Sequence, residues 1–256
     1  MSDVNYAFAA HIVNAVKGNS GNHEAKGVWL NFPATTETLT AALKKIGLSP
    51  NANEKQYSLD NFDAIYSEMN DMLKGTKTID ELNYLANRIS ELDDLEDFVF
   101  QMTLKAGICK NAKDAINITY NTEYYNAVTD MRNWENIGAY LAEQNGLDIS
   151  VIGDLSDYID YAGYAKNHLE RNGGYFFEDV YLEVGLTNFT VKYDGKKENI
   201  PQEYRIEQAT PIKKIVSAVI PKSKPKQSIK KQLAALRRNT KKTSHISKHK
   251  NKDLEV

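Results

Sequence analysis

The sequence has little of what many functional classes require. Its 256 residues include one cysteine, Cys109, so the chain cannot form an internal disulfide framework, and a reducing compartment suits it. It has no run of about 18 apolar residues, which excludes a transmembrane helix. The first ten residues, MSDVNYAFAA, lack the basic and apolar regions of a secretory signal. We therefore expect a cytoplasmic protein with no membrane partner.

Signals of catalysis and of cofactor binding are also missing. The stretch GNSGNHEAKG at 18–27 has no Gly-Lys-Ser/Thr end, and is typical of a hairpin loop rather than of a phosphate-binding loop. The five histidines show neither HExxH nor paired Cys/His spacing. Cys109 has no histidine signature near it and is predicted to lie in the core. We therefore predict that the protein is not an enzyme and that it uses no metal and no cofactor.

The net charge of −2 hides two segments of opposite charge. Residues 206–256, the basic tail, carry 14 Lys/Arg and three Asp/Glu, a net of +11. Residues 1–205, the acidic body, keep 18 basic and 31 acidic residues, a net of −13. The prolines and lysines of the tail are typical of a largely disordered segment, with one basic amphipathic helix predicted at Gln227–Arg238. The tail can be a solubilising extension, can bind nucleic-acid phosphates, or can fold over the acidic body at low salt.

Hydrophobic periodicity predicts a mixed α+β fold. Alternating apolar residues indicate strands, and apolar residues three and four positions apart indicate helices. The weakly periodic residues 50–77 are predicted to be irregular. In chain order, the predicted elements are strands at 6–15 and 27–32 joined as a hairpin, helices at 35–45, 79–92, 94–106, from about 111, at 134–144 and 158–168, and strands at 175–184 and 187–193.

Single residues mark the ends and buried faces of these helices. Thr78, with Glu81 three positions on, has the pattern of a capping box. Gly47 is placed to end the helix at 35–45 in the left-handed conformation. In the helix at 94–106 the spacing predicts burial of Leu95, Phe98, Val99 and Met102. The elements suggest an N-terminal α/β domain at 1–77, a central helical domain at 78–120, a C-terminal α/β domain at 121–205 and the basic tail at 206–256.

Three stretches, in this order, carry family-like motifs. They are Gly27–Leu48 (GVWLNFPATTETLTAALKKIGL), Ile79–Asp94 (IDELNYLANRISELDD), and Ile137–Gly146 with Leu155–Leu169 (IGAYLAEQNG and LSDYIDYAGYAKNHL). Together they resemble the ArdA family of antirestriction proteins found on conjugative elements; the last one resembles the family's antirestriction motif and the segment after it. Ala139 stands before Tyr140 where the family usually has arginine, and Ala165-Lys166-Asn167 replaces Gly-Arg-Asp.

This resemblance implies three small domains strung into an elongated, curved molecule that dimerises through the last domain. It implies a DNA mimic that occupies the DNA-binding groove of a type I restriction–modification enzyme, at its methyltransferase and specificity subunits, and so protects incoming mobile DNA. The alternative is a nucleic-acid-binding accessory protein of a mobile element that acts through its basic tail.

Thirteen carboxylates of the acidic body are the candidate DNA-mimic residues. B-DNA presents about one negative charge per 1.7 Å of its axis, so a mimic needs many Asp and Glu on its surface and few lysines beside them. The interval 114–160 holds nine acidic residues and one basic residue, Arg132. For each acid the alternative is an ordinary solvated position. The candidates are Asp93, Asp94, Glu96, Asp97, Asp114, Glu123, Asp130, Glu135, Glu143, Asp148, Asp154, Asp157 and Asp160.

Four of the 15 tyrosines are candidates for the motif and for a dimer contact: Tyr140, Tyr158, Tyr161 and Tyr164. The spacing predicts that Tyr158, Tyr161 and Tyr164 share one helix face. Aromatic residues are enriched at protein interfaces. The alternative is that these rings pack in the core of an amphipathic helix.

Overall fold

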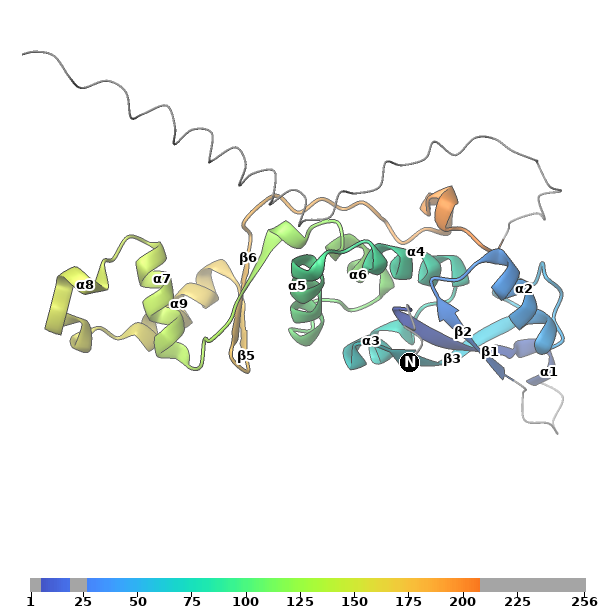
Figure 1. The fold of residues 1–256 in the computed structure, drawn as a ribbon, viewed down its shortest axis with the longest axis horizontal. Coiled ribbons are helices and arrows are strands. Elements are labelled where there is room, and N and C mark those ends of the chain that lie inside the picture. Colours follow the sequence, from blue (N-terminus) through green and yellow to red (C-terminus); the bar gives the residue numbers. More distant parts are fainter. Residues whose placement is uncertain (1–5, 19–26, 208–256) are drawn as a thin grey trace, which may run out of the picture. The chain divides into compact units, whose positions relative to one another are not determined.

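The computed structural model describes residues 6–18 and 27–207 (Figure 1). They form helices and two three-stranded antiparallel sheets, so the mixed α+β class is confirmed. The loop expected at 19–26 and the tail helix expected at Gln227–Arg238 lie outside the described residues. The domain boundaries expected after residues 77, 120 and 205 stay predictions.

The first sheet has β1 (Phe8–Asn14) between β2 (Gly27–Phe32) and β3 (Tyr57–Ala64). β1 and β2 pair antiparallel, with Phe8 opposite Phe32, as the predicted hairpin requires. A short helix, α1 (Ala15–Gly18), follows β1.

The helix α2 (Thr36–Lys45) packs against β2. Thr35 is its N-cap, and Gly47 ends it with a φ of +76°, as predicted for Gly47. Its apolar face is buried, with Leu39, Ala42, Leu43 and Ile46 all within the core.

The prediction that residues 50–77 are irregular is wrong, because this stretch forms β3 and α3 (Ser67–Leu73). The pairing of β3 with β1 shifts in register between His11 and Ile12, whose partners are Asn61 and Leu59. This bulge breaks the alternation that identifies a strand in sequence. α3 has seven residues, too few for a clear helical period.

Three helices follow: α4 (Ile79–Ser90), α5 (Asp94–Lys105) and α6 (Ala112–Ile118). Thr78 caps α4 by accepting a hydrogen bond from the Glu81 amide at 3.3 Å, but the reverse half of the predicted capping box is not formed. The Glu81 carboxylate lies instead beside the Tyr193 hydroxyl. The predicted burial of Leu95 is wrong: its side chain is 71% exposed, because α5 buries the face that carries Val99, Phe100, Met102 and Leu104.

The second sheet has β6 (Val180–Val184) between β4 (Tyr125–Val128) and β5 (Tyr175–Phe177). The predicted single strand at 175–184 is therefore two strands, joined by a turn in which Glu178 has a φ of +54°. β4 was not predicted, because four residues are too short to show a strand period. A 3₁₀ turn, η1 (Thr122–Tyr124), precedes β4.

Between β4 and β5 lie α7 (Trp134–Gln144), α8 (Ile149–Ile152), the 3₁₀ segment η2 (Gly153–Tyr158) and α9 (Tyr161–Asn172). The helix expected from Tyr158 begins only at Tyr161, with Asp160 as N-cap. Tyr158 ends η2, so it does not share a helix face with Tyr161 and Tyr164, and that prediction is wrong.

The segment 186–207, here called the strap, contains no strand or α-helix, so the strand predicted at 187–193 is also wrong. It includes two 3₁₀ turns, η3 (Lys197–Asn199) and η4 (Gln202–Tyr204). Its 3₁₀ turns form their own hydrogen bonds, and side chains of α4 and of the α6 region, rather than a neighbouring strand, bond several of its other backbone groups.

The buried residues form two hydrophobic clusters. The larger runs from the first sheet through α4, α5 and α6 to β6 and the strap. The smaller holds α7 against α9 and consists of Ile137, Leu141, Ala165 and Tyr181. The apolar core of α7 and α9 is therefore distinct from that of the rest of the described chain.

Candidate interaction surface

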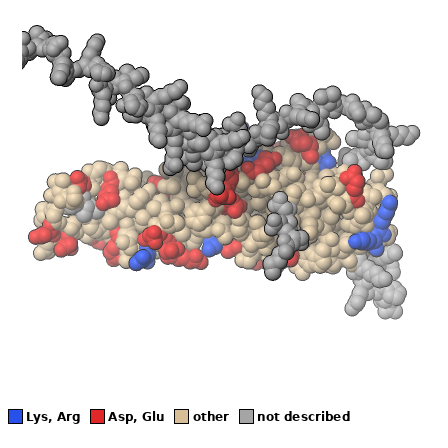
Figure 2. Space-filling model, in the orientation of Figure 1, with Lys and Arg blue, Asp and Glu red and all other residues tan. Residues whose placement is uncertain are grey.

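The thirteen candidate acids lie from the N-cap of α5 to the N-cap of α9. Ten of them are exposed, whereas Glu96, Asp97 and Asp114 are half-buried. Figure 2 shows one face of the molecule, on which patches of Asp and Glu outnumber those of Lys and Arg. The described residues thus present carboxylates to solvent at many points.

Two of the acids cap the start of α5, and a third bonds the helix to Tyr66. Asp93 is the N-cap, and its Oδ1 accepts hydrogen bonds from the amides of Leu95 and Glu96 at 3.0 and 2.9 Å. Glu96 Oε2 accepts in return from the Asp93 amide at 3.0 Å, which completes a capping box. Asp97 accepts a hydrogen bond from the Tyr66 hydroxyl. These carboxylates therefore stabilise the fold around α5, in addition to any role in binding a partner.

Three further acids have similar positions at later helices. Asp114, in α6, accepts from the Lys110 amide at 3.1 Å. Asp148 caps α8 through Ser150, whose side-chain and backbone hydrogen bonds lower the pKa of the Asp148 carboxyl. Asp160 caps α9 by accepting from the Gly163 amide at 2.7 Å. Each of the three keeps a negative charge near a helix start, where the helix dipole favours it.

The side chains of the other seven candidates make no hydrogen bond or ion pair with another described residue. Their side chains are exposed, and no helix cap depends on them. Substituting them should therefore change the surface charge without changing the fold. They are Asp94, Glu123, Asp130, Glu135, Glu143, Asp154 and Asp157.

The candidate tyrosines separate into a packed pair and an exposed pair. Tyr140 is half-buried with its ring 6.3 Å from that of Tyr181, and burial raises the pKa of its hydroxyl. Tyr161 is half-buried at the start of α9. Tyr164 and Tyr158 are exposed, Tyr158 to 86%. The packed pair belongs to the α7–α9 region, and only the exposed pair is open to a partner.

Tyr158 belongs to a group of exposed apolar side chains in the segment 151–164. Val151 and Leu155 are 77% and 68% exposed, and Ile159 and Tyr164 are also solvent-exposed. Contiguous exposed apolar surface marks protein interaction sites, and five exposed apolar side chains in one short segment make it a candidate. We call this group, Val151, Leu155, Tyr158, Ile159 and Tyr164, the apolar patch.

The departures from the family motif have identifiable places in the α7–α9 contact. Ala165 is fully buried in the smaller cluster. Lys166 places its ammonium 5.7 Å from the centre of the Trp134 ring, where a cation is attracted to the aromatic face. Ala139 is half-buried on α7.

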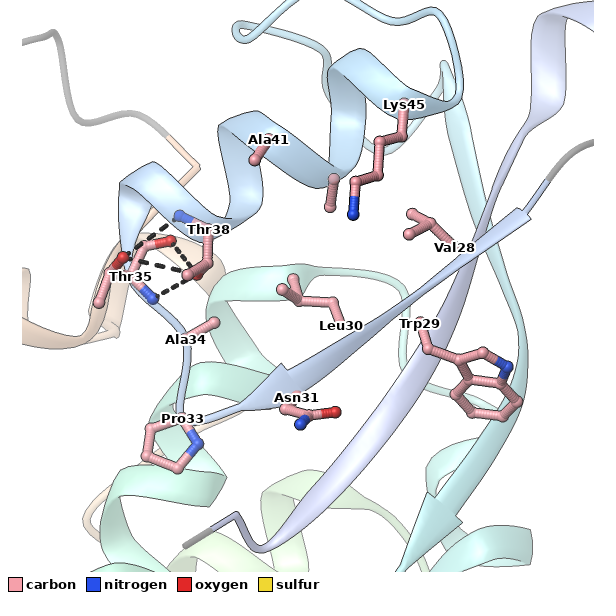
Figure 3. Close-up of a pocket in the computed structure, with 11 residues that line it drawn as sticks. Val28, Trp29, Leu30, Asn31, Pro33, Ala34, Thr35, Thr38, Ala41 and Lys45 are labelled. Atoms are coloured by element: carbon pink, nitrogen blue, oxygen red, sulfur yellow. Dashed lines mark hydrogen bonds between the residues drawn. The ribbon is translucent and has the colours of Figure 1, made fainter. Parts of the chain in front are cut away.

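A pocket of about 420 Å³ lies between β2 and α2 (Figure 3). Val28 and Leu30 of β2 line it from one side, and Ala41 and Lys45 of α2 from the other. Its walls are mostly aliphatic, and no acid, histidine or cysteine lines it. The polar side chains that line it are Asn31, Thr35, Thr38 and Lys45.

Cys109 and His11 belong to residue types that often take part in catalysis, but here both contact other parts of the fold. Cys109 is buried, and burial raises the pKa of its thiol to about 12. His11 is hydrogen-bonded to Asp60 at 2.7 Å, and its ring lies tilted against that of Trp29, with the centroids 5.1 Å apart. Within residues 6–18 and 27–207 there is no group of three or more His, Cys, Asp or Glu side chains arranged to hold a metal ion. Nor does this part of the chain contain a helix long and apolar enough to cross a membrane.

Sequence reasoning missed two features of this region. Val151 and Leu155 were not singled out, although two apolar residues beside an acid-rich stretch are a usable signal. Gly138 was also missed: it lies inside α7, where a glycine costs about 1 kcal/mol relative to alanine and so usually has a packing reason.

A family model described as antirestriction protein (ArdA) matches residues 12–183, more than half of the chain. The three family-like stretches at 27–48, 79–94 and 137–169 lie inside this range, whereas the strap and the basic tail lie beyond it. No curated protein matches the chain significantly. The length of the family match shows that the chain belongs to the ArdA family of antirestriction proteins.

Proposed function

We propose that the acidic body acts as a DNA mimic, which occupies the DNA-binding groove of a type I restriction–modification enzyme and so protects incoming mobile DNA. The observation that carries the proposal is the interval 114–160 of a chain in the ArdA family, which has nine acids and one basic residue. The mechanism is binding, in the cytoplasm, and it requires no catalytic residue, metal or cofactor.

Electrostatics supports this mechanism. Enzymes that bind DNA place basic side chains where phosphates lie, and these contacts supply much of their affinity. A protein surface with exposed carboxylates and few lysines meets the same basic side chains. The six carboxylates that also cap helices or accept local hydrogen bonds still carry their charge, so all thirteen candidates are proposed to contribute. Because the attraction is between charges, it should weaken as salt rises.

A homodimer is the second part of the proposal. The apolar patch is the surface that supports it, because it exposes Tyr158, Leu155 and Val151 beside the candidate acids Asp154 and Asp157. Pairing of two copies through this patch would remove apolar side chains from water. It would also double the number of carboxylates presented to one enzyme.

The test is competition for a type I methyltransferase. A labelled duplex that carries the enzyme's recognition sequence is titrated with the full chain, and displacement is expected at micromolar protein or below. The triple variant Glu143→Gln, Asp154→Asn, Asp157→Asn should displace DNA at least about tenfold more weakly. A matched control neutralises three exposed acids elsewhere, Asp63, Glu68 and Glu203, and should displace DNA nearly as well as the unaltered chain.

The alternative function, nucleic-acid binding by the basic tail, predicts that activity requires the tail. Deletion of residues 208–256 removes the tail lysines and should leave displacement unchanged or stronger if the acidic body is the inhibitor. Loss of activity on that deletion, together with direct binding of DNA by the full chain, would favour the accessory-protein alternative. No displacement by the full chain at micromolar concentration would contradict mimicry.

A further inference from the structure

Hydrogen bonds to its backbone attach the strap to α4 and to the α6 region. The two 3₁₀ turns of the strap satisfy their own backbone groups; the Ile200 amide, for example, donates to the Lys197 carbonyl. Outside these turns the amides and carbonyls of the strap need partners in the rest of the chain. At Thr190, Tyr193 and Ile206 the partners are amide and carboxylate side chains of α4 and of the α6 region.

Two asparagines of the α6 region hold the first half of the strap. Asn121 Oδ1 accepts from the Thr190 amide at 2.7 Å, and Asn121 Nδ2 donates to the Thr190 carbonyl at 2.9 Å. Asn117 Oδ1 accepts from the amides of Lys192 and Tyr193 at 2.7 and 2.9 Å, and its Nδ2 donates to the Tyr193 carbonyl at 2.8 Å. Each asparagine thus engages both backbone groups of one strap residue, as a neighbouring strand would.

Two residues of α4 hold the second half. Asn83 Nδ2 donates to the Tyr204 carbonyl at 2.9 Å. Asp80, which is fully buried, accepts at Oδ1 from the amides of Ile206 and Glu207 at 2.7 and 2.8 Å. We call the row Asp80, Asn83, Asn117 and Asn121 the backbone clamp.

Side chains of the strap fill the space beside the backbone clamp. Tyr193 and Ile200 are each 1% exposed, and Ile206 is also buried. The ring of Tyr204 stacks on that of Tyr84 at 4.7 Å. Glu207 accepts hydrogen bonds from Lys197, at 2.7 Å, and from the Tyr57 hydroxyl of β3. Buried anchors at intervals along an extended backbone are the general pattern of peptide recognition.

We propose that α4 and α6 form a binding groove for an extended polypeptide backbone, and that residues 190–207 are its ligand, held in cis. The groove lies within the range of the family match and its ligand lies beyond it. The joint between them is Gly185, which has a φ of +85° and is followed by exposed residues up to Lys192. The strap is therefore a separable ligand, and through Ile206 and Glu207 it holds the first two residues of the basic tail on α4.

Cleaving the full chain at this joint tests whether the strap binds the groove as a separate polypeptide. A site for a specific protease is inserted between Leu186 and Thr187, both exposed, and the folded protein is cleaved without denaturant. The two fragments should co-elute in size-exclusion chromatography, and a labelled synthetic peptide of residues 187–207 added in excess should exchange into the groove. Release of the C-terminal fragment on cleavage, with the larger fragment still folded by circular dichroism, would overturn the proposal.

Two substitutions at Thr190 in the same cleavable chain test backbone recognition. Thr190→Pro removes the amide N–H that donates a hydrogen bond to Asn121 Oδ1. Because one hydrogen bond is lost, the cleaved fragment should be released about tenfold faster. Thr190→Ala keeps that amide and should leave the rate unchanged, because the threonine side chain is exposed. Equal effects of the two substitutions, or none from proline, would contradict recognition through the backbone. Neither measurement involves a restriction enzyme, so the result is independent of the proposed inhibition.

Discussion

The backbone of Gly138 in α7 lies directly against the carbonyl group of Tyr161, the first residue of α9. A Cβ atom placed on Gly138 would overlap the Tyr161 carbonyl oxygen. Since Tyr161 follows the N-cap Asp160, the contact brings the start of α9 onto the first half of α7. The absence of one methyl group therefore sets how closely the two helices of the antirestriction-like segment approach.

Gly138→Ala should force α7 and α9 apart. Alanine favours the helix itself by about 1 kcal/mol, but overpacking a close backbone contact costs about 1–3 kcal/mol, so we expect a net loss of stability. Urea unfolding followed by circular dichroism measures it. Gly75→Ala is the matched control, because a Cβ there would meet nothing within 4 Å and its φ is not positive. Equal stability of the two variants would show that the helices adjust freely.

Asp160 and Asp157 lie three residues apart, and the structure separates their roles. Asp160→Ala removes the cap of α9 and should lower stability by about 1 kcal/mol. Asp157→Ala removes an exposed charge with no described partner and should leave the unfolding curve unchanged. Both should weaken displacement of DNA from the methyltransferase to a similar degree if the charges act as phosphate mimics. Asp160→Asn, which keeps a capping oxygen, should restore stability but not displacement.

Cys109 should be inert in the folded protein. Burial raises the pKa of its thiol from an ordinary 9.0 to about 12, so at pH 8 the thiolate fraction is about a thousandfold lower than in the unfolded chain. Because the folded pKa is the higher one, the stabilising contribution of the neutral thiol is complete below pH 9 and is lost as the pH rises towards 12. Alkylation by iodoacetamide at pH 8, with and without urea, measures the difference. Since the chain has no second cysteine, the label reports on this site alone.

The apolar patch should control self-association. Leu155→Ser combined with Tyr158→Ser removes two of its most exposed side chains and should weaken the proposed dimer at least about tenfold. Analytical ultracentrifugation over a range of protein concentrations measures the dissociation constant. Leu186→Ser, which alters an exposed leucine outside the patch, should leave the constant unchanged. If the unsubstituted chain is monomeric at all protein concentrations, the proposed dimer is wrong.

Sequence periodicity predicted the parts of the fold in which local pattern and burial agree. The helices α2, α4, α5 and α7 begin close to their predicted first residues, because each combines an apolar stripe with a capping side chain. The pattern failed where a bulge interrupts β3, and where β4 and β5 are too short to show a period. It also failed at 187–193, where alternating residues lie on a strap held by asparagine side chains.

The density of carboxylates between 114 and 160 and the family motifs were determined by the sequence alone, since both are properties of residue order. Which carboxylates cap helices and which face solvent without a partner was decided by the tertiary structure, because that depends on where each helix begins. Packing likewise decided the need for glycine at 138 and the buried positions of Asp80 and Asn117. These residues contact parts of the chain 23 to 127 positions away, and no local pattern encodes such a distance.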